Sequence, residues 1–318
     1  MKKRKGKLAL VTGAAGFIGS HMCDELLKRK WQVVGIDNFK TGFKKNLPKH
    51  PNFRFYDMDV CEPYDLMVIF SENKFDLVLH IAGNASIVKA SDGPNEDVAT
   101  NLNGTIMVSL LCKKYQVPRL LYASSMTAYG LNTTKPEEGA CYPISTYGIT
   151  KFAAERFVIN MQQDLECETK VTAFRMFNVY GPRQDLNNPY QGVAAIFMKK
   201  ALNGEVITLF GDGKQTRDFV YISDVVRMWM MCIDNKKSFG EVFNVGTGKD
   251  ISMISLINTI SKVMFGKSIV TWQHEQERIG DQKKSRANAN KAARFGWLPQ
   301  VSLEQGLKKM YQWAKKEK

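Results

Sequence analysis

Tyr147 and Lys151 lie four positions apart in the stretch YGITK, which begins a helical pattern. Residues at this spacing share one face of a helix, so the two side chains are expected to lie together. An ammonium group beside a phenol favours the ionised phenol and lowers its pKa from an ordinary value of about 10. Tyr147 is therefore a candidate general base. The spacing alone is common by chance, and it becomes informative only beside a cofactor site.

Two serines, Ser124 and Ser125, end an apolar run that predicts a strand at 120–124. In a parallel sheet, side chains at the carboxyl ends of the strands face the bound ligand. A serine hydroxyl there can share or relay a substrate proton with Tyr147.

A glycine-rich turn near the amino terminus predicts a phosphate-binding loop. Gly13, Gly16 and Gly19 are spaced G-x-x-G-x-x-G between a predicted strand at 8–12 and a predicted helix at 17–28. Glycine lets the backbone turn tightly, approach a pyrophosphate and pack the helix against the sheet. The start of the helix then offers N–H groups and the positive end of its dipole to the phosphates.

Asp37 follows the second predicted strand, at 32–36, about twenty residues beyond the turn. A carboxylate there accepts hydrogen bonds from both ribose hydroxyls and repels a 2′-phosphate, which favours NAD over NADP. The alternative is a loop Asp that caps a turn. The positive nicotinamide ring of NAD would add to the effect of Lys151 on Tyr147.

Short apolar runs that alternate with helical patterns predict a doubly wound parallel α/β sheet. Further strands are expected at 53–56, 77–81, 120–124 and 171–175, and helices near 95–114 and 146–164. After residue 178 the pattern is less regular. We therefore expect an NAD-binding Rossmann domain at 1–178, to which the chain returns around 218–248. A smaller nucleotide-sugar-binding α/β lobe would occupy mainly 179–318.

Length and composition indicate a globular chain. Its 318 residues exceed one typical domain, with 44% hydrophobic and 24% charged residues. No apolar run approaches the ~18 residues of a membrane-spanning helix. The net charge of +14 suggests nucleic acid, but residues 1–7 carry five bases and no acid, and residues 283–318 carry ten bases and two acids. The remaining span is almost neutral and has no recognition motif, so no nucleic-acid partner and no membrane partner are expected.

The cysteines and the amino terminus predict a cytoplasmic protein. Six cysteines are widely spread with no C-x-x-C pair, which is typical of reduced structural thiols. Four histidines form no cluster with them, so no metal site is expected. The basic start is followed by an apolar run that breaks at Thr12-Gly13 without a cleavage site, which argues against an export signal.

Several motifs in order along the chain resemble the extended short-chain dehydrogenase/reductase family, and within it the NAD-dependent nucleotide-sugar epimerases. The motifs are TGAAGFIG at 12–19, HIAG at 80–83, NLNGT at 101–105, SSMTAYG at 124–130, YGITK at 147–151, RMFNVYGPRQ at 175–184, FGDGKQTRDFVYISDV at 210–225, NVGTG at 244–248 and RIGD at 278–281. The likeness covers nearly the whole chain, and it implies a homodimer formed through the helices near 95–114 and 146–164. Their apolar residues could equally be ordinary core.

The resemblance implies three sets of site residues. The catalytic set is Tyr147, Lys151 and Ser125, the serine lying five positions before Gly130. The NAD-binding set is Gly13, Gly16, Phe17, Ile18, Gly19, Asp37, Asn38, Asp59, Val60, Ile81, Ala82, Gly83, Asn101, Tyr147, Lys151 and Phe177. The substrate-binding set is Ser125, Asn178, Val193, Phe210, Arg217, Arg278, Asp281 and Ser285. The two arginines suit a diphosphate, whose oxygens accept bidentate guanidinium hydrogen bonds.

Met126 and Thr127 narrow the expected reaction. Dehydrating relatives carry an Asp-Glu pair at these positions, decarboxylating relatives usually a Glu nearby, and neither side chain here is an acid. Ser, Tyr, Lys and NAD suffice to oxidise one carbinol and reduce it again. The resemblance thus implies 4-epimerisation of a UDP-hexose, UDP-glucose or UDP-galactose, through a transient 4-keto sugar. In related epimerases a bulky Tyr at the position of Ser285 excludes larger sugars, so UDP-N-acetyl sugars are also candidate substrates.

Two other functions remain open. A dehydrogenase, 4-ketoreductase or dehydratase of the same family would use the same Tyr and Lys, and accumulation of NADH would identify net oxidation. A non-catalytic NAD-binding sensor or scaffold would not need the Tyr–Lys pair together with the diphosphate arginines.

Overall fold

The computed structural model describes residues 6–85, 93–188, 192–277 and 282–317. The chain forms two compact units, each interrupted in sequence. Unit 1 comprises residues 1–128, 145–175 and 226–243, and unit 2 comprises residues 129–144, 176–225 and 244–318. The polypeptide therefore leaves unit 1 three times and returns to it twice.

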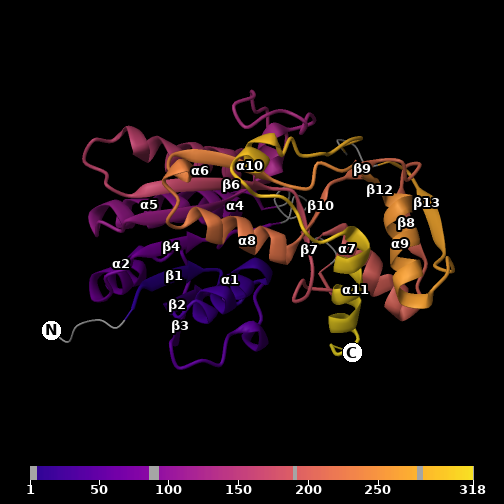
Figure 1. The fold of residues 1–318 in the computed structure, drawn as a ribbon, viewed down its shortest axis with the longest axis horizontal. Coiled ribbons are helices and arrows are strands. Elements are labelled where there is room, and N and C mark those ends of the chain that lie inside the picture. The colour runs from indigo at the N-terminus through magenta and orange to yellow at the C-terminus, as the bar shows by residue number, and fades with distance from the viewer. Residues whose placement is uncertain (1–5, 86–92, 189–191, 278–281, 318) are drawn as a thin grey trace. The chain divides into compact units, whose positions relative to one another are not determined.

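Unit 1 is built around a seven-stranded sheet in the order β11-β6-β5-β4-β1-β2-β3 (Figure 1). Strands β3, β2, β1, β4 and β5 pair in parallel with one another, which confirms the predicted α/β class. The sheet strands are β1 (Leu8–Thr12), β2 (Gln32–Asp37), β3 (Phe53–Asp57), β4 (Leu77–His80), β5 (Arg119–Ser125), β6 (Lys170–Met176) and β11 (Glu241–Val245).

The helices of the sheet-forming part of the chain connect these strands. They are α1 (Phe17–Lys28), α2 (Pro63–Glu72), α4 (Pro94–Asp97), α5 (Thr105–Lys114), α6 (Thr146–Asn160) and α8 (Ile222–Cys232). Short 3-10 segments are η1 (Lys44–Asn46), η3 (Met126–Tyr129), η4 (Met161–Gln163) and η5 (Lys236–Ser238), and η2 (Val98–Gly104) is a π-helix. The predicted helix near 95–114 is thus three consecutive pieces, and α2 was not predicted at all.

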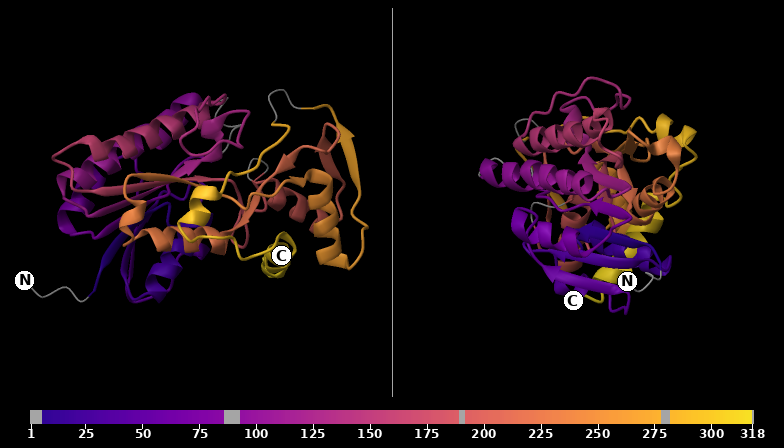
Figure 2. Two further views of the ribbon diagram at one scale, coloured as in Figure 1. Left: turned by 45° about the horizontal axis from the view of Figure 1, so that its top comes forward. Right: turned by 90° about the vertical axis from the view of Figure 1, so that its left-hand side faces the viewer.

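The strand order places the helices on two faces of the sheet (Figure 2). The connection through α1 leads from β1 to β2 in one direction along the sheet, whereas α2 leads from β3 back across β1 to β4. Because such crossovers are right-handed, connections in opposite directions lie on opposite faces. α5 packs against both α2 and α6, so these three helices form one layer.

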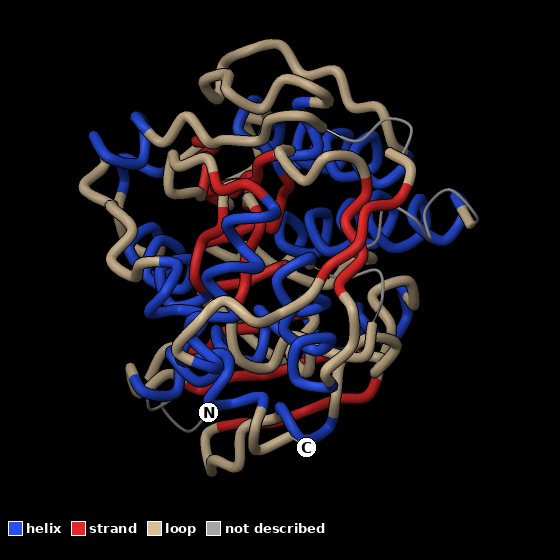
Figure 3. Tube along the Cα trace, turned by 90° about the vertical axis from the view of Figure 1, so that its right-hand side faces the viewer, coloured by secondary structure: helices blue, strands red, loops and turns tan. Residues whose placement is uncertain are grey.

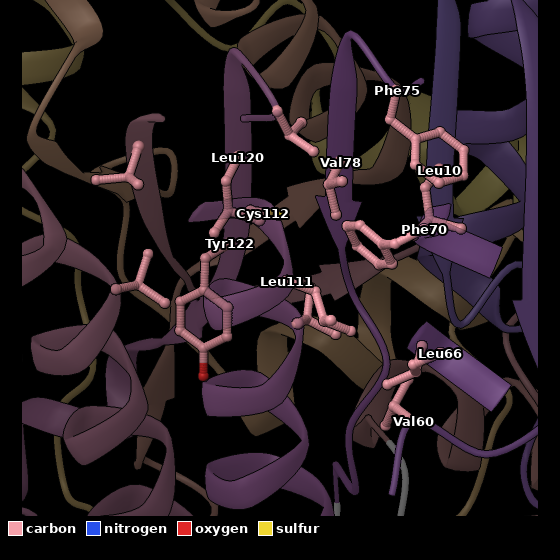
Figure 4. Close-up of a cluster of buried hydrophobic side chains, with 14 of the residues drawn as sticks. Leu10, Val60, Leu66, Phe70, Phe75, Val78, Leu111, Cys112, Leu120 and Tyr122 are labelled. Carbon is pink, nitrogen blue, oxygen red and sulfur yellow. The ribbon is translucent and has the colours of Figure 1, made fainter. Parts of the chain in front are cut away.

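The core of unit 1 lies between the sheet and this helical layer (Figure 4). Leu10, Val78 and Leu120 come from neighbouring strands, and Phe70 of α2 and Leu111 of α5 cover them. All five side chains are buried, and this continuous apolar contact holds the helices against the sheet.

The apolar residues of the helices proposed for dimer contact divide between core and surface. Val108, Leu111 and Val158 are buried in the core, whereas Leu110 is 49% exposed.

The described residues of unit 2 form short paired strands and several helices. β7 (Asn178–Tyr180) pairs with β10 (Phe219–Tyr221), β9 (Thr216–Arg217) with β12 (Ile251–Ser252), and β8 (Ile207–Phe210) with β13 (Trp272–Glu275). Figure 3 separates such strands from the helices and loops by colour. The described helices are α7 (Val193–Asn203), α9 (Met253–Phe265), α10 (Asn290–Arg294) and α11 (Leu303–Ala314). α11 begins with a capping box between Ser302 and Gln305.

Two findings concern the chain as a whole. All six cysteines are free thiols, four of them buried. Among the described residues, no helix combines the length and the apolar character needed to cross a membrane.

A buried ion pair between Glu155 and Arg175 connects α6 to the sheet. Glu155 is fully buried and Arg175 of β6 is 2% exposed. The Arg175 Nη2 and Nε groups donate to the Glu155 carboxylate at 2.6 and 2.9 Å, and Ser124 Oγ donates to it at 2.6 Å. The carboxylate is thereby hydrogen-bonded to β5 and β6 at once, one helical turn beyond Lys151.

Glu155→Gln should lower the free energy of unfolding by about 3–5 kcal/mol, because it leaves the Arg175 charge buried without its counter-charge. Denaturant unfolding measures the change. The matched control is Glu25→Gln, which removes the exposed i,i+4 ion pair between Arg29 and Glu25 and should cost less than about 0.5 kcal/mol. Equal effects for the two variants would contradict the structural role of the buried pair.

Candidate active site

The glycine-rich turn joins β1 to α1, and its backbone packs too closely to admit a side chain at Gly19. Gly13 has a φ of +71°, and a Cβ on Gly19 would lie 2.0 Å from the Gly13 carbonyl oxygen. Gly16 is the N-cap of α1, and no side chain caps the helix there. Phe17 and Ile18 open the helix and are partly buried. The backbone at the start of α1 is thus shaped to receive the phosphates of a dinucleotide.

Asp37 is the last residue of β2 and lies beside this turn. Its carboxylate accepts hydrogen bonds from the Ala15 N–H at 2.9 Å and the Phe39 N–H at 2.8 Å. Burial raises its pKa, although these backbone hydrogen bonds oppose the shift. The Gly16 N–H is a third backbone donor to this carboxylate, and the remaining lone-pair capacity still allows ribose hydroxyls to donate to it. The residues therefore fit NAD, as predicted.

Asn38 and Asp59 extend the same edge of the sheet. The Asn38 side chain donates to Asp59 at 2.7 Å, and the Cys61 N–H donates to Asp59 at 2.8 Å. Burial raises the pKa of Asp59, but these hydrogen bonds outweigh it and the pKa lies below its ordinary value. Val60, the next residue, packs its side chain into the apolar core of unit 1.

A hydroxyl–imidazole chain ties the ends of β1 and β4 to α5. His80 Nδ1 and Nε2 lie 2.8 and 2.9 Å from the hydroxyls of Thr12 and Thr105. Thr105 donates to the Asn101 carbonyl at 2.7 Å, so it accepts from Nε2–H, and Thr12 donates to Nδ1. Thr12 in turn accepts the N–H groups of Ile81 and Ala82, both at 3.0 Å.

This series of hydrogen bonds requires a neutral imidazole, because Nδ1 must accept a hydrogen bond from the Thr12 hydroxyl. Complete burial, with the nearby positive charge of Lys151, lowers the pKa of His80 to about 3. The sequence-based prediction did not include His80 or Thr12, although the HIAG motif contains the histidine. Together they fix the backbone of Ile81 and Ala82, two of the expected NAD-binding residues.

Ser125, Tyr147 and Lys151 are brought together in unit 1, at the end of β5 and the first turns of α6. Ser145 caps α6 by accepting the Gly148 N–H, which starts the helix just before Tyr147. Lys151 is 4% exposed, and its Nζ lies 4.4 Å from the centroid of the Tyr122 ring. Burial lowers the pKa of Lys151 to about 7, opposed by the charges of Glu155 and Asp97.

The sequence-based expectation for the pKa of Tyr147 was wrong for the chain by itself. Burial raises this pKa above its ordinary value, and the negative charge of Asp97 adds to the increase. A hydrogen bond from Ser125 lowers it only in part. Desolvation of the phenolate is the larger effect, and it cannot be inferred from the four-residue spacing to Lys151.

Thr127 determines how Ser125 presents its proton. The Thr127 hydroxyl and N–H both donate to Ser125 Oγ, at 2.9 and 3.2 Å. Both lone pairs of Ser125 are then used, so its own O–H is left to donate, and Tyr147 is its partner. The hydroxyl pair therefore directs one proton toward the phenol oxygen.

Asn101 lies on the π-helix η2 and is completely buried. Its amide donates to the Asn84 carbonyl at 3.2 Å, and its Oδ1 has no hydrogen-bond partner within the described structure. A Cβ on Gly83 would lie 2.6 Å from this Oδ1 and 3.7 Å from Lys151 Nζ. Three expected NAD-binding residues, Gly83, Asn101 and Lys151, thus lie close together. Single-turn π-helices of this kind occur frequently at functional sites.

In unit 2, the expected substrate-binding residues Asn178 and Ser285 contact the segment 216–218, which contains the third, Arg217. Asn178 Nδ2 and N donate to the Asp218 carbonyl at 3.2 and 3.0 Å. Arg217 Nη1 donates to the Gln282 carbonyl at 2.7 Å, and the Ser285 N–H donates to the Thr216 carbonyl at 3.1 Å. Ser285 is fully buried.

Asp218, which the sequence-based prediction did not include, organises this region. Its carboxylate accepts the N–H groups of Thr247, Gly248 and Ala287 at 2.8, 2.7 and 3.1 Å, and the Thr247 hydroxyl at 2.6 Å. It therefore joins the NVGTG loop to the segment that carries Ser285.

The remaining expected substrate and cofactor residues of unit 2 lie on other elements. Val193 begins α7 and Phe210 ends β8, two elements that pack together. Phe177 is buried and donates its N–H to the Val245 carbonyl at 3.0 Å. Arg278 and Asp281 lie outside the described residues.

Comparison with known proteins agrees with this geometry. Residues 9–246 match the NAD dependent epimerase/dehydratase family. UDP-glucose 4-epimerase of Mycolicibacterium smegmatis is 34% identical over 310 residues, 94% of this chain and 96% of that protein. UDP-glucuronic acid decarboxylase 2 of Arabidopsis thaliana is 34% identical over 316 residues, 96% of this chain and 67% of that protein.

Solved structures extend the likeness to the whole fold. UDP-glucose 4-epimerase from Thermotoga maritima with UDP-glucose matches with a TM-score of 0.90 at 35% identity, covering 98% of this chain and 99% of that one. UDP-glucuronic acid 4-epimerase from Bacillus cereus, with UDP-glucuronic acid and NAD, matches with a TM-score of 0.88 at 31% identity, covering 98% and 100%.

The chain belongs to the NAD dependent epimerase/dehydratase family. It is an NAD-dependent enzyme that modifies nucleotide sugars.

The stability of the protein should fall as the pH drops from about 6.5 toward 3, in part because of His80. The unfolded histidine protonates near pH 6.5 while the folded one stays neutral to about pH 3, so the unfolded state binds the extra proton in this window. His80→Gln should remove about 1 kcal/mol per pH unit of this slope between pH 6 and 5. Denaturant unfolding at both pH values measures it, and an unchanged slope would contradict a neutral buried imidazole.

Proposed function

We propose that the chain is an NAD-dependent UDP-hexose 4-epimerase that acts through a transient 4-keto sugar. The observation that carries the proposal is the cluster of Ser125, Tyr147 and Lys151 in unit 1, with no carboxyl group at positions 126 and 127. Such a cluster serves reversible proton transfer at one hydroxyl. The likeness to UDP-glucose 4-epimerases over nearly the whole chain supports it.

In this proposal Tyr147 exchanges a proton with the 4-hydroxyl of the sugar. Ser125 donates to the phenol oxygen and so stabilises its ionised form, and Thr127 keeps the serine proton directed there. Lys151 adds positive charge one helical turn away. Burial opposes ionisation of Tyr147, so the phenolate forms only with these groups and the bound cofactor in place.

The residues of the glycine-rich turn and Asp37 would hold the NAD. Bound NAD supplies the acceptor and donor of the two electrons exchanged at the sugar carbon, together with a positively charged ring. Because the oxidised and reduced sugars alternate within one cycle, the protein has to retain the cofactor. Burial of Asp37 and the close-packed glycines favour such retention, since these contacts are pre-formed.

Asn178 and Arg217 in unit 2 would bind the nucleotide diphosphate, and Arg278 and Asp281 are expected to join them. A guanidinium group suits phosphate oxygens because its planar donors can bind two of them at once. Asp218 supports this role indirectly, by fixing the backbone around Arg217.

Decarboxylation of a UDP-sugar acid is the second candidate, because a UDP-glucuronic acid decarboxylase is as similar as an epimerase in identity. The side chains favour epimerisation. Loss of carbon dioxide or water calls for further proton transfers, and Met126 and Thr127 offer no acid for them. Thr127 is also already engaged with Ser125.

One experiment tests the proposal and its alternatives. The purified protein is incubated separately with UDP-glucose, UDP-N-acetylglucosamine and UDP-glucuronic acid, and NMR resolves the products. Conversion to the C4 epimer without accumulation of NADH is the expected result. A pentose product would identify a decarboxylase, NADH would identify a dehydrogenase, and no conversion of any sugar would leave epimerisation unsupported.

Tyr147→Phe should lower turnover at least a hundredfold, because it removes the only proposed proton acceptor for the sugar hydroxyl. Bound NAD, measured after denaturation of the purified protein, should remain at the wild-type level. Tyr142→Phe is the matched control, because Tyr142 is 68% exposed. Near-normal turnover of Tyr147→Phe would remove this residue from the mechanism.

Ser285→Tyr should selectively abolish turnover of UDP-N-acetylglucosamine while turnover of UDP-glucose persists, since the larger ring would take the space of the acetamido group. Ser285→Ala, which does not reduce the space, should accept both sugars. Because Ser285 is fully buried, thermal unfolding has to show that both variants fold. Equal losses for the two sugars would contradict a role of this position in selecting the sugar.

A further inference from the structure

Asp97 is a buried carboxylate that neither the motifs nor the proposed mechanism uses. It ends α4 and is 2% exposed. One oxygen, Oδ2, has no hydrogen-bond partner in the described part of the chain. Burying a carboxylate oxygen without a partner is costly, so such a group needs a compensating charge or donor nearby.

Polar contacts connect Asp97 to the acid–base cluster. The Asn84 side chain is hydrogen-bonded to the Asp97 carboxylate. The backbone carbonyl of Asn84 accepts from the Asn101 amide, and both Asn101 Oδ1 and Lys151 Nζ lie close to the position that a Cβ on Gly83 would occupy. α4 also packs directly against α6, the helix that carries Tyr147 and Lys151.

Among the described residues of this region, Asp97 Oδ2 and Asn101 Oδ1 are buried oxygens without a hydrogen-bond partner, and Lys151 carries a buried ammonium group. Both oxygens are acceptors, and an acceptor is stabilised by a positive charge.

Among the described residues, the other titratable groups around the cluster have partners or are neutral. Glu155 is paired with Arg175, and His80 is neutral. Tyr122 is a buried phenol beneath the ammonium group, and burial raises its pKa well above the ordinary value. Lys40, whose charge also reaches Asp97, forms an exposed ion pair with Glu96.

We propose that Asp97 is a positioning residue for the reaction, the buried counter-charge that keeps Lys151 in its ammonium form beside Tyr147. This role of Asp97 depends on the proposed epimerase function only where it is tested by the pH dependence of turnover. Glu155 cannot serve alone, because its charge is already balanced by Arg175, whereas the Asp97 carboxylate accepts only a neutral amide among the described contacts.

The electrostatics agree with this role. Burial lowers the pKa of Lys151, and the negative charges of Glu155 and Asp97 oppose that shift. Asp97 also raises the pKa of Tyr147, after the larger effect of burial. Burial raises the pKa of Asp97 itself, and the Asn84 hydrogen bond and the charges of Lys151 and Lys40 oppose that shift.

The sign of the expected change follows directly. An anion stabilises the protonated form of any neighbouring group, so it raises the pKa of Lys151 and of Tyr147 alike. Removing the anion lowers both. The pH–activity profile, whose two limbs report the paired titration, should therefore move as a whole toward lower pH.

Asp97→Asn tests the proposal, since the amide keeps the size of the side chain and removes its charge. Both limbs of the kcat profile should move down by roughly one pH unit, with KM nearly unchanged. Glu96→Gln is the matched control, because it removes an exposed charge from the same helix and should leave the profile in place. A profile for Asp97→Asn that coincides with the wild type would overturn the proposal.

A second measurement does not depend on turnover. NMR of isotope-labelled tyrosine, with Tyr147→Phe to assign the signal, follows the phenol titration directly. The Tyr147 pKa should be lower in Asp97→Asn by a similar amount, and lower in Asp97→Ser if the amide does not fold. An unshifted Tyr147 signal would overturn the proposal, whereas a shifted signal without epimerase activity would contradict only the proposed function.

Discussion

The burial of one lysine is the constraint on which the acid–base site depends. Lys151 is 4% exposed, and removal from water lowers its pKa to about 7. An ammonium group in such a place persists only if negative charges or polar oxygens replace the lost water. The surrounding helices supply them: Glu155 lies one turn along the same helix, Asp97 is on α4, and Asn101 is on the π-helix. The charges of these carboxylates oppose the lowering of the lysine pKa by burial.

The burial of Lys151 also explains why the neighbouring His80 is neutral and the neighbouring Glu155 is paired with Arg175. A protonated His80 would add a second positive charge in the core, and its pKa of about 3 prevents this. Glu155 would over-compensate Lys151 if it were not balanced by Arg175. The Glu155–Arg175 ion pair and the neutral His80 therefore keep further net charge away from the Lys151 ammonium group. They also join helices to the sheet.

The sequence predicted what local patterns determine. Continuous apolar runs predicted strands β1 and β2. The glycine spacing predicted the tight turn, in which a Cβ on Gly19 would collide with Gly13. The sequence did not predict α2, Asp97 or Asp218, because their roles arise from contacts between segments distant in sequence. For the chain without cofactor, the expected direction of the Tyr147 pKa was wrong for the same reason: four-residue spacing indicates the neighbour, whereas burial depends on the whole fold.

Position 127 shows how one side chain can limit the chemistry of a shared scaffold. Thr127 donates to Ser125 twice, through its hydroxyl and its N–H, and so fixes the direction of the serine proton. A carboxylate at this position would accept rather than donate, and the serine proton would turn toward it and away from Tyr147. The site would gain an acid for elimination and lose a donor to the phenolate. A threonine here therefore favours proton exchange at a single hydroxyl, which is the requirement of epimerisation.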